Sequence, residues 1–440
     1  MQRKYGLFTS ITMITGIVIG SGIFFKSDDV LRYTNGNMFL GIIVFVIAAI
    51  AIIFGSLSIS QLAARVDAPG GIIGYMETFV NRKMAGATGW FQMFLYFAPI
   101  IAVVAWVTGL YMCQLFHIEA TTKNSTIIAG IVLVVIFGIN ALSAALGGFI
   151  QNAAMIIKIV PLVIIAITGI IFGKPMEIAH NDFSSISHTI VSSNWITAFA
   201  PIAFSYDGWS VATTVCHEIK NSKKNLPLAM IIAPVIVLTC YLLYFIGITS
   251  LIGVEVVMEQ GNDSVYIAAN QIFGGTGAKL ILIFVIISVV GTLNGLVLAF
   301  IQLPYSLAIR KLVPCTNLLT KQSKYFGHMP VYSALIAFVV SLFWIFINYL
   351  TQEYAILSDV SEIPVCLSYI LFAVLYITVI KLRKQGEIKG VMMGYVVPGL
   401  AILGSIIIVG GTIFHPSFLV FVIVSAIISL LGYKYSARNE

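Results

Sequence analysis

The feature that most constrains this chain is a series of apolar runs of 18 or more residues, each long enough to cross a lipid bilayer. About 20 apolar residues in a helix span the roughly 30 Å hydrocarbon core of a membrane. Only 9% of the 440 residues are charged, whereas soluble domains carry about 25%. Runs of this length predict helices, because strands of a transmembrane barrel alternate over about ten residues. An all-α integral membrane protein is therefore expected.

Twelve spans are expected, with both termini on the cytoplasmic side. Lys and Arg accumulate in the cytoplasmic loops of membrane proteins. With the amino terminus inside, 18 of the 24 Lys and Arg residues fall on that side; the exceptions are Lys26, Arg32, Lys123, Lys174 and Lys279 outside, and Lys158 within a span. The expected spans are 7–33, 38–63, 84–113, 125–144, 149–173, 193–218, 226–252, 278–309, 331–350, 355–382, 391–411 and 414–434.

Charge and cysteine content argue against several other classes of protein. The net charge of +7 comes from basic residues scattered in short loops, so it reports topology and not nucleic-acid binding. The five cysteines have neither metal-ligand spacing nor a disulfide framework. No cofactor, metal ion or nucleic-acid partner is expected, and the first apolar run is expected to stay as a retained span.

Two of the expected spans contain residues that interrupt helices. Residues 16–25 read G-I-V-I-G-S-G-I-F-F, and glycine is among the least favourable residues in a helix. The stretch is either a packing face, in which Gly16 and Gly20 let two helices approach, or a break in the span. The sixth span reads F-A-P-I-A-F-S-Y-D-G-W-S over 199–210, with Asp207 at mid-depth. An ionisable residue there is a functional-site hypothesis, although helix packing can also satisfy it.

The two interrupted spans stand five helices apart, which is typical of transporters built from inverted repeats. In such proteins the corresponding discontinuous helices meet at the bilayer midplane and form the substrate site. A half-helix that begins at a break offers N–H groups to a carboxylate, and one that ends there offers carbonyls to an ammonium group. A site with both kinds of end suits a zwitterion, and the recurrence favours a break over a packing face.

Lys158 is the remaining charge within a span, three residues before Pro161. An unpaired ammonium at this depth is costly, so carbonyls or a carboxylate must receive it. The sequence leaves two possible partners for the Lys158 ammonium group. The carbonyls of the first-helix break would make Lys158 a fixed substitute for a coupling cation, whereas Asp207 would form a structural ion pair with it.

Several short motifs stand in a characteristic order along the first eight spans. They are I-G-S-G-I-F (19–24), A-P-G-G-I-I-G-Y (68–75), Lys158, F-S-Y-D-G-W (204–209), K-N-L-P (224–227) and G-T-L-N-G (291–295). In these the chain resembles the amino acid, polyamine and organocation transporters, and within them the L-amino-acid transporter group. The resemblance implies amino acid transport by alternating access in a LeuT-type fold. The first inverted repeat would cover 1–173, the second 193–382, and two peripheral helices 391–434.

The resemblance also implies a substrate site at the two breaks. The matching residues are Val18, Gly20, Ser21, Gly22, Phe204, Asp207 and Ser210. The N–H groups of Gly20, Ser21 and Gly22 would hold the substrate carboxylate. Carbonyls of Val18, Phe204 and Asp207 would hold its amino group. The Phe204 ring would act as an inner gate, and Ser210 would touch the substrate side chain.

Two further matches concern coupling, and one departure concerns partners. Lys158 matches a lysine that sits where related carriers bind sodium, and Tyr241 matches its neighbour in the seventh span. Animal members bind a heavy chain through a cysteine between the third and fourth spans. That loop has no cysteine here, and Cys113 lies at the end of the third span. No covalent heavy-chain partner is therefore expected.

The leading hypothesis is a sodium-independent exchanger of small or medium neutral L-amino acids in a prokaryotic plasma membrane, with amino acids and the lipid bilayer as its partners. One alternative is a proton-coupled symporter in which Lys158 or Asp207 titrates. Another is an antiporter of cationic amino acids or polyamines, with Asp207 as counter-charge. An enzyme is not expected, because only Lys158 and Asp207 are ionisable at membrane depth. A channel would need a ring of carbonyls or charges along a pore.

Overall fold

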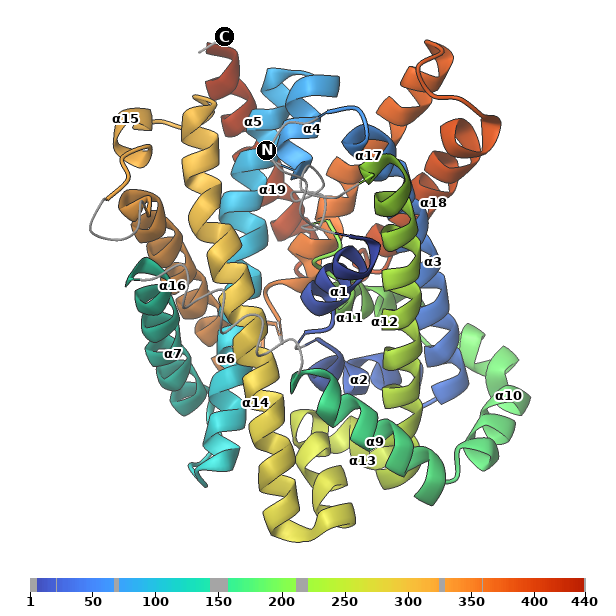
Figure 1. Ribbon diagram of the computed structural model, residues 1–440. Helices are drawn as coiled ribbons and strands as arrows, with labels where there is room; N and C mark the ends of the chain where they lie inside the picture. Colours follow the sequence, from blue (N-terminus) through green and yellow to red (C-terminus); the bar gives the residue numbers. More distant parts are fainter. Residues whose placement is uncertain are drawn as a thin grey trace. The chain divides into compact units, whose positions relative to one another are not determined.

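A computed structural model describes residues 6–20, 22–66, 71–142, 157–210, 221–323, 329–357 and 359–438. Within these residues the chain is helical, and its only extended pairing is an isolated bridge between Ser323 and Met329 (Figure 1). Nine of the described helices are long and apolar enough to cross a membrane, or ten if one pair bent by 83° counts as a single span. The expected all-helical membrane fold is confirmed, and the total of twelve spans stays a prediction.

The described helices agree with several expected spans, such as the second, and differ from others, such as the eighth and tenth. They are α1 (Leu7–Val18), α2 (Gly22–Tyr33), α3 (Met38–Ala63), α4 (Gly71–Phe79), α5 (Arg82–Phe91), η1 (Gln92–Tyr96), α6 (Phe97–Leu115), α7 (Thr122–Leu142), α9 (Ile159–Phe172), α10 (Pro175–Ser192), η2 (Trp195–Ala198), α11 (Phe199–Ser205), α12 (Ser222–Ile252), α13 (Val254–Gln260), η4 (Gly261–Asp263), α14 (Ser264–Ile309), α15 (Thr316–Leu319), α16 (Val331–Glu353), α17 (Glu362–Lys384), η6 (Met392–Val396), α18 (Val397–Gly410) and α19 (Phe418–Arg438).

Local sequence explains where several helices begin. The Asn37 side chain caps α3 by accepting a hydrogen bond from Leu40 N at 2.7 Å. The Asn81 side chain caps α5 by accepting one from Met84 N at 2.8 Å. Asparagine is a favoured capping residue because its side-chain oxygen satisfies a free N–H of the first turn. Pro175 stands in the first turn of α10, where its missing N–H costs nothing.

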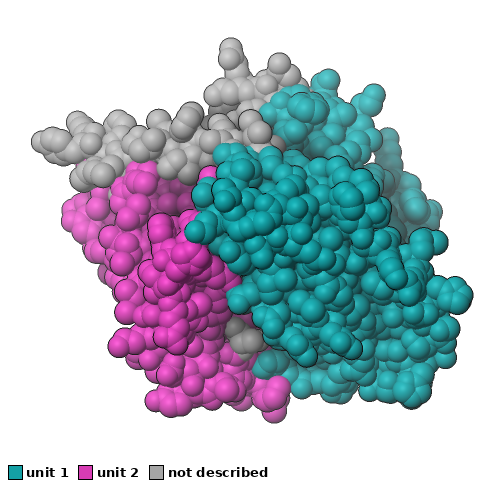
Figure 2. All heavy atoms as spheres, turned by 90° about the horizontal axis from the view of Figure 1, so that it is seen from below, with its two compact units in different colours: residues 1–71, 157–285, 365–415 teal, residues 72–156, 286–364, 416–440 magenta. Residues whose placement is uncertain are grey.

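The described chain divides into two compact units, which Figure 2 colours separately. Unit 1 comprises residues 1–71, 157–285 and 365–415, and unit 2 comprises 72–156, 286–364 and 416–440. Each unit takes segments from both halves of the chain. The first, second, sixth and seventh expected spans belong to unit 1, and the third, fourth and ninth belong to unit 2, so spans five apart in the sequence share a unit.

Small residues let helices approach closely inside each unit. In unit 1, α12 packs on α9, and a Cβ atom added at Gly169 would overlap the Gly247 carbonyl oxygen. In unit 2, a Cβ added at Gly86 of α5 would lie 2.7 Å from the Gly432 carbonyl oxygen of α19. Close backbone approach of this kind is how helices associate in a membrane, where lipid is as apolar as the side chains.

A cluster of charges ties three helices of unit 2 together. Glu77 of α4 forms ion pairs with Arg82 of α5 and with Arg310, which directly follows α14. Arg82 also donates to the Arg310 carbonyl oxygen at 2.5 Å. Arg310 belongs to the A-I-R-K-L-V-P stretch after the eighth span. The ion pairs therefore attach the stretch after the eighth span to Glu77, which precedes the third span.

Candidate functional site

The first expected span is broken in the middle. Helix α1 ends at Val18, Ile19 is extended (φ −66°, ψ 97°), and α2 begins at Gly22. The last four carbonyls of a helix have no partner within it, so a helix end inside a protein needs other donors. The structure confirms a break rather than a continuous helix at I-G-S-G. It leaves the carbonyls of the last turn of α1 facing other elements of unit 1.

Lys158 supplies one of these donors. Its Nζ donates to the Gly16 carbonyl oxygen at 2.7 Å, and the side chain is fully buried just before α9. Of the two partners that the sequence left open, the structure therefore places the ammonium group on the first-helix carbonyls and not on Asp207. A buried ammonium group is tolerated when carbonyl dipoles receive it. The contact supplies a donor to a carbonyl oxygen in the last turn of α1.

Tyr241 of α12 supplies the second donor and connects the two broken spans. Its hydroxyl oxygen lies 2.9 Å from the Val18 carbonyl oxygen and 2.8 Å from the Ser205 carbonyl oxygen. One hydroxyl proton is shared between the two acceptors, each at the end of a half-helix. The Tyr241 side chain is fully buried. The seventh span thus holds the ends of α1 and α11 at one point.

The sixth span is broken in the stretch 199–210 that the sequence singled out, next to Asp207; Pro201 lies inside α11. Helix α11 ends at Ser205, and residues 206–210 form turns. The Asp207 N–H donates to the Phe204 carbonyl oxygen at 3.0 Å. Gly208 has φ +99°, a backbone conformation that other residues adopt only with strain. Glycine therefore makes this turn possible.

The two breaks touch through Gly22. A Cβ atom added to Gly22 would lie 2.6 Å from the Cα of Ser205, far closer than real Cβ contacts. Helix α2 therefore packs against α11 at a point where no side chain fits. The chain breaks after Val18, and Gly22 at the start of α2 is a close-packing glycine. The packing face expected at Gly16 and Gly20 stays a prediction.

The remaining predicted site residues lie around these contacts. Phe204 is buried, and its ring meets the Phe25 ring edge-on, with 5.6 Å between the centroids. Ser210 is buried and Asp207 is half-buried in the turn after α11. Gly20 lies in the bend between α1 and α2, and Ser21 is outside the described residues.

Sequence reasoning missed two residues of this region. Ser205 contributes both the carbonyl that Tyr241 reaches and the backbone against which Gly22 packs. Trp209 is buried, and its Nε1 donates to the Tyr369 hydroxyl of α17 at 3.4 Å, which anchors the turn. Both residues belong to F-S-Y-D-G-W, so the motif itself was the available signal. Among the described residues no group of His, Cys, Asp and Glu is arranged to hold a metal ion.

Comparison with known proteins decides the family. The family model described as "Amino acid permease" matches residues 5–433. The chain belongs to this amino acid permease family. It is therefore a transporter of amino acids and not an enzyme. The family assignment agrees with the resemblance carried by the motifs of the first eight spans.

Several characterised permeases are similar in sequence. The serine/threonine exchanger SteT of Bacillus subtilis is 28% identical over 420 residues, which cover 94% of this chain and 92% of that protein. The b(0,+)-type amino acid transporter 1 of Mus musculus is 27% identical over 67% of this chain and 60% of its own length. The human cystine/glutamate transporter is 24% identical over 69% of this chain and 61% of its own length. Of these three relatives, the bacterial protein matches along nearly the whole chain.

Proposed function

We propose that this permease exchanges small and medium neutral L-amino acids across the plasma membrane by alternating access, independently of sodium. The observation that carries the proposal is the Lys158 ammonium group on the Gly16 carbonyl at the first break. There a covalently held cation occupies the place that the family resemblance assigns to a coupling ion. The similarity to a serine/threonine exchanger over 94% of the chain supports exchange of small neutral substrates.

The architecture proposed for this function has twelve spans in a LeuT-type arrangement of five plus five, followed by two peripheral helices. The breaks in α1–α2 and after α11 support it, because they fall in the first span of each proposed repeat. The assignment of spans five apart to the same compact unit supports it as well.

In the proposed site the substrate lies at the two breaks. N–H groups of Gly20, Ser21 and Gly22, at the start of α2, would hold its carboxylate through hydrogen bonds and the positive end of the helix dipole. Carbonyls of Val18, Phe204 and Asp207 would hold its ammonium group. The Val18 carbonyl already accepts from Tyr241, and a carbonyl oxygen has a second lone pair for the substrate.

The Phe204 ring would close over the bound amino acid, and the Ser210 hydroxyl would contact its side chain. Both residues are buried beside the turn at 206–210. A site closed by an aromatic ring and lined by short polar groups suits small and medium side chains.

The proposed protein works without a covalent heavy chain, with both termini in the cytoplasm. Cys113 is fully buried at the end of α6, and its Sγ lies 4.0 Å from the Ser125 Oγ. A buried thiol is inaccessible to a cysteine of another chain. The loop after α6, where animal relatives carry the linking cysteine, has none.

Reconstitution in liposomes tests exchange. Labelled threonine should enter vesicles that contain unlabelled serine, and should not accumulate in empty ones. Uptake should stay the same when potassium replaces sodium and when the pH gradient is removed. Accumulation in empty vesicles under an inward proton gradient would support the proton-coupled symporter instead.

Substitution of Lys158 supplies the matching test of the site. Lys158→Met should reduce exchange by at least about tenfold, because the buried Gly16 carbonyl loses its donor. Lys279→Met, which changes an exposed lysine, is the control and should exchange normally. Normal exchange by Lys158→Met would refute the assigned coupling role.

A further inference from the structure

Helix α10 exposes a row of apolar side chains along one face, which we call the apolar stripe. It consists of Met176, Phe183 and Ile190, which follow one another at intervals of seven residues and therefore share a helix face. These residues are 82%, 63% and 43% exposed. Exposed apolar side chains that gather on one face mark an interaction surface.

The other faces of α10 are polar and have different surroundings. Asp182 and Thr189 face the protein, because Thr189 is buried and the Asp182 carboxylate accepts hydrogen bonds from the backbone at the start of α3. Glu177, Asn181 and His188 form a second, exposed polar face. With 3.6 residues per turn, the apolar stripe, the inward face and the exposed polar face lie roughly 110–140° apart around the helix axis. Such a helix fits a position where protein, water and an apolar phase meet.

The direction of α10 follows from the helix before it. Helix α9 lies in the expected fifth span and exposes Val163, Ile167 and Ile170 on one face, as a helix in contact with lipid does. Helix α10 follows after two residues and is bent by 83° from α9 (Figure 1). Spanning helices tilt by only about 20° on average from the bilayer normal, so α10 runs close to the membrane plane.

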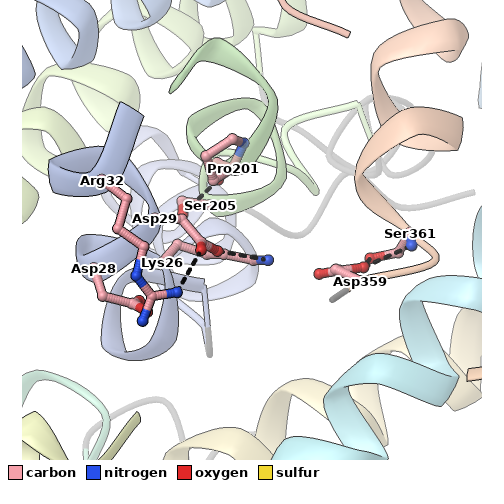
Figure 3. Close-up of polar contacts among 8 residues, drawn as sticks. All are labelled: Lys26, Asp28, Asp29, Arg32, Pro201, Ser205, Asp359 and Ser361. Carbon is pink, nitrogen blue, oxygen red and sulfur yellow. Dashed lines mark hydrogen bonds and ion pairs between the residues drawn. The ribbon is translucent and has the colours of Figure 1, made fainter. Parts of the chain in front are cut away.

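The depth of α10 follows from its contacts with the turn between α2 and α3. Near the end of α2, the half-exposed Arg32 pairs with Asp28 at 3.2 Å and with Asp29 at 3.6 Å (Figure 3). Charges of this kind belong near the boundary with water, and the second span begins six residues after Arg32. The Phe39 ring, at the start of that span, meets the Phe183 ring edge-on, with 5.4 Å between the centroids. Helix α10 is therefore held at the membrane boundary.

We propose that α10 is an interfacial helix, which lies along the bilayer surface with its apolar stripe among the lipid acyl chains. The apolar face of such a helix enters about 5–10 Å below the boundary between headgroups and acyl chains. In the proposed topology this surface is the outer one. A spanning position for α10 would instead place Glu177, Asp182 and His188 in hydrocarbon, which is costly. The lipid contact is separate from the substrate site and does not depend on which amino acids are exchanged.

Photocrosslinking in nanodiscs of phosphatidylethanolamine and phosphatidylglycerol tests the proposal. p-Benzoylphenylalanine replaces each residue of the apolar stripe in turn, and mass spectrometry measures the lipid adducts. The adduct yield should equal that of the same replacement at Ile167, on the lipid-facing side of α9. Asn181 and His188, on the exposed polar face, are the matched controls and should give at least about tenfold fewer adducts, because this face lies outside the acyl region.

Hydroxyl-radical footprinting of the unsubstituted protein in the same nanodiscs is the second measurement. The Met176 thioether is readily oxidised where water reaches it. Relative to the chain unfolded in detergent, oxidation of Met176 should be strongly slowed, whereas modification of His188 should not be. No substitution is made here, so a variant that fails to fold cannot explain the result.

Three outcomes would overturn the proposal. Equal lipid adducts from the apolar stripe and the exposed polar face would place α10 within the hydrocarbon. Adducts at Ile167 without adducts at the stripe, or oxidation of Met176 at the unfolded rate, would place the stripe in water. Crosslinks from the stripe to a second copy of the chain would assign it to a protein interface. Failure of the unsubstituted protein to exchange threonine would contradict only the proposed function.

Discussion

Single residues at the two breaks serve several purposes at once. Gly22 begins α2, offers a backbone N–H in the proposed site, and leaves room for Ser205 of α11. Ser205 in turn presents its carbonyl to Tyr241, while its own hydroxyl donates to the Pro201 carbonyl oxygen at 2.9 Å. The half-helix ends are therefore held by side chains and close packing, which satisfy backbone groups that the breaks leave open.

Gly22→Ala should abolish exchange. Its Cβ atom would overlap the Ser205 backbone, and overpacking of this kind typically costs about 1–3 kcal/mol or displaces a helix. Exchange in liposomes and the melting temperature in detergent measure the two effects. Gly399→Ala is the matched control, because a Cβ atom there meets nothing within 4 Å. Wild-type exchange by Gly22→Ala would contradict the close approach of α2 and α11.

At the scale of elements, the seventh span holds the two broken spans together through one hydroxyl. Tyr241→Phe keeps the ring but removes the donor to the Val18 and Ser205 carbonyls. Leaving buried acceptors unsatisfied costs about 1–3 kcal/mol, so the melting temperature and the exchange rate should both fall. Tyr332→Phe, at an exposed tyrosine of α16, is the control and should change neither. An unchanged exchange rate in Tyr241→Phe would show that this link is dispensable.

Helix α10, the polar helix after the fifth span, is attached to the start of α3 by one carboxylate. Asp182 Oδ2 accepts from Met38 N at 2.6 Å and from Phe39 N at 3.3 Å. The Asn37 side chain donates to the Asp182 carbonyl oxygen at 3.0 Å. Burial raises the pKa of the Asp182 carboxyl above its ordinary 3.8, although the two N–H bonds oppose the shift.

This shift predicts a pH dependence. The folded protein holds the Asp182 proton more tightly than the unfolded chain, so the stabilisation is present at low pH and is lost as pH rises through the raised pKa. Asp182→Asn keeps an acceptor oxygen and removes the titration. The melting temperature of the wild type relative to Asp182→Asn should therefore decrease as the pH rises from 3.8 through the raised pKa. A constant difference over that range would show that Asp182 does not titrate in it.

At the scale of the whole molecule, the proposed topology places the loop between the eighth and ninth spans in the cytoplasm. Cys315 lies in this loop, exposed at the start of α15. A membrane-impermeant maleimide should label it in inside-out vesicles and not in right-side-out ones. Loss of labelling in Cys315→Ser would identify Cys315 as the labelled residue. The buried Cys113 and Cys366 should not react. Labelling of Cys315 from outside would reverse the orientation.

The expected helices agree with the structure where the sequence signal is local. The second span was expected over 38–63 and is Met38–Ala63, because its apolar run is bounded by an asparagine cap. The eighth was expected over 278–309, but α14 already begins at Ser264 and bends at Gly274. Its first turns are too polar for a hydrophobicity pattern to detect, and they are helical all the same.

The sequence by itself determined that the chain is a helical membrane protein, where its first and sixth spans break, and to which family it belongs. These properties follow from run length, from glycine and proline, and from motif order, all of which are local. Only the tertiary structure decided which group receives Lys158 and why residue 22 is glycine. Each of these depends on contacts between distant segments, such as the 142 residues that separate Gly16 from Lys158.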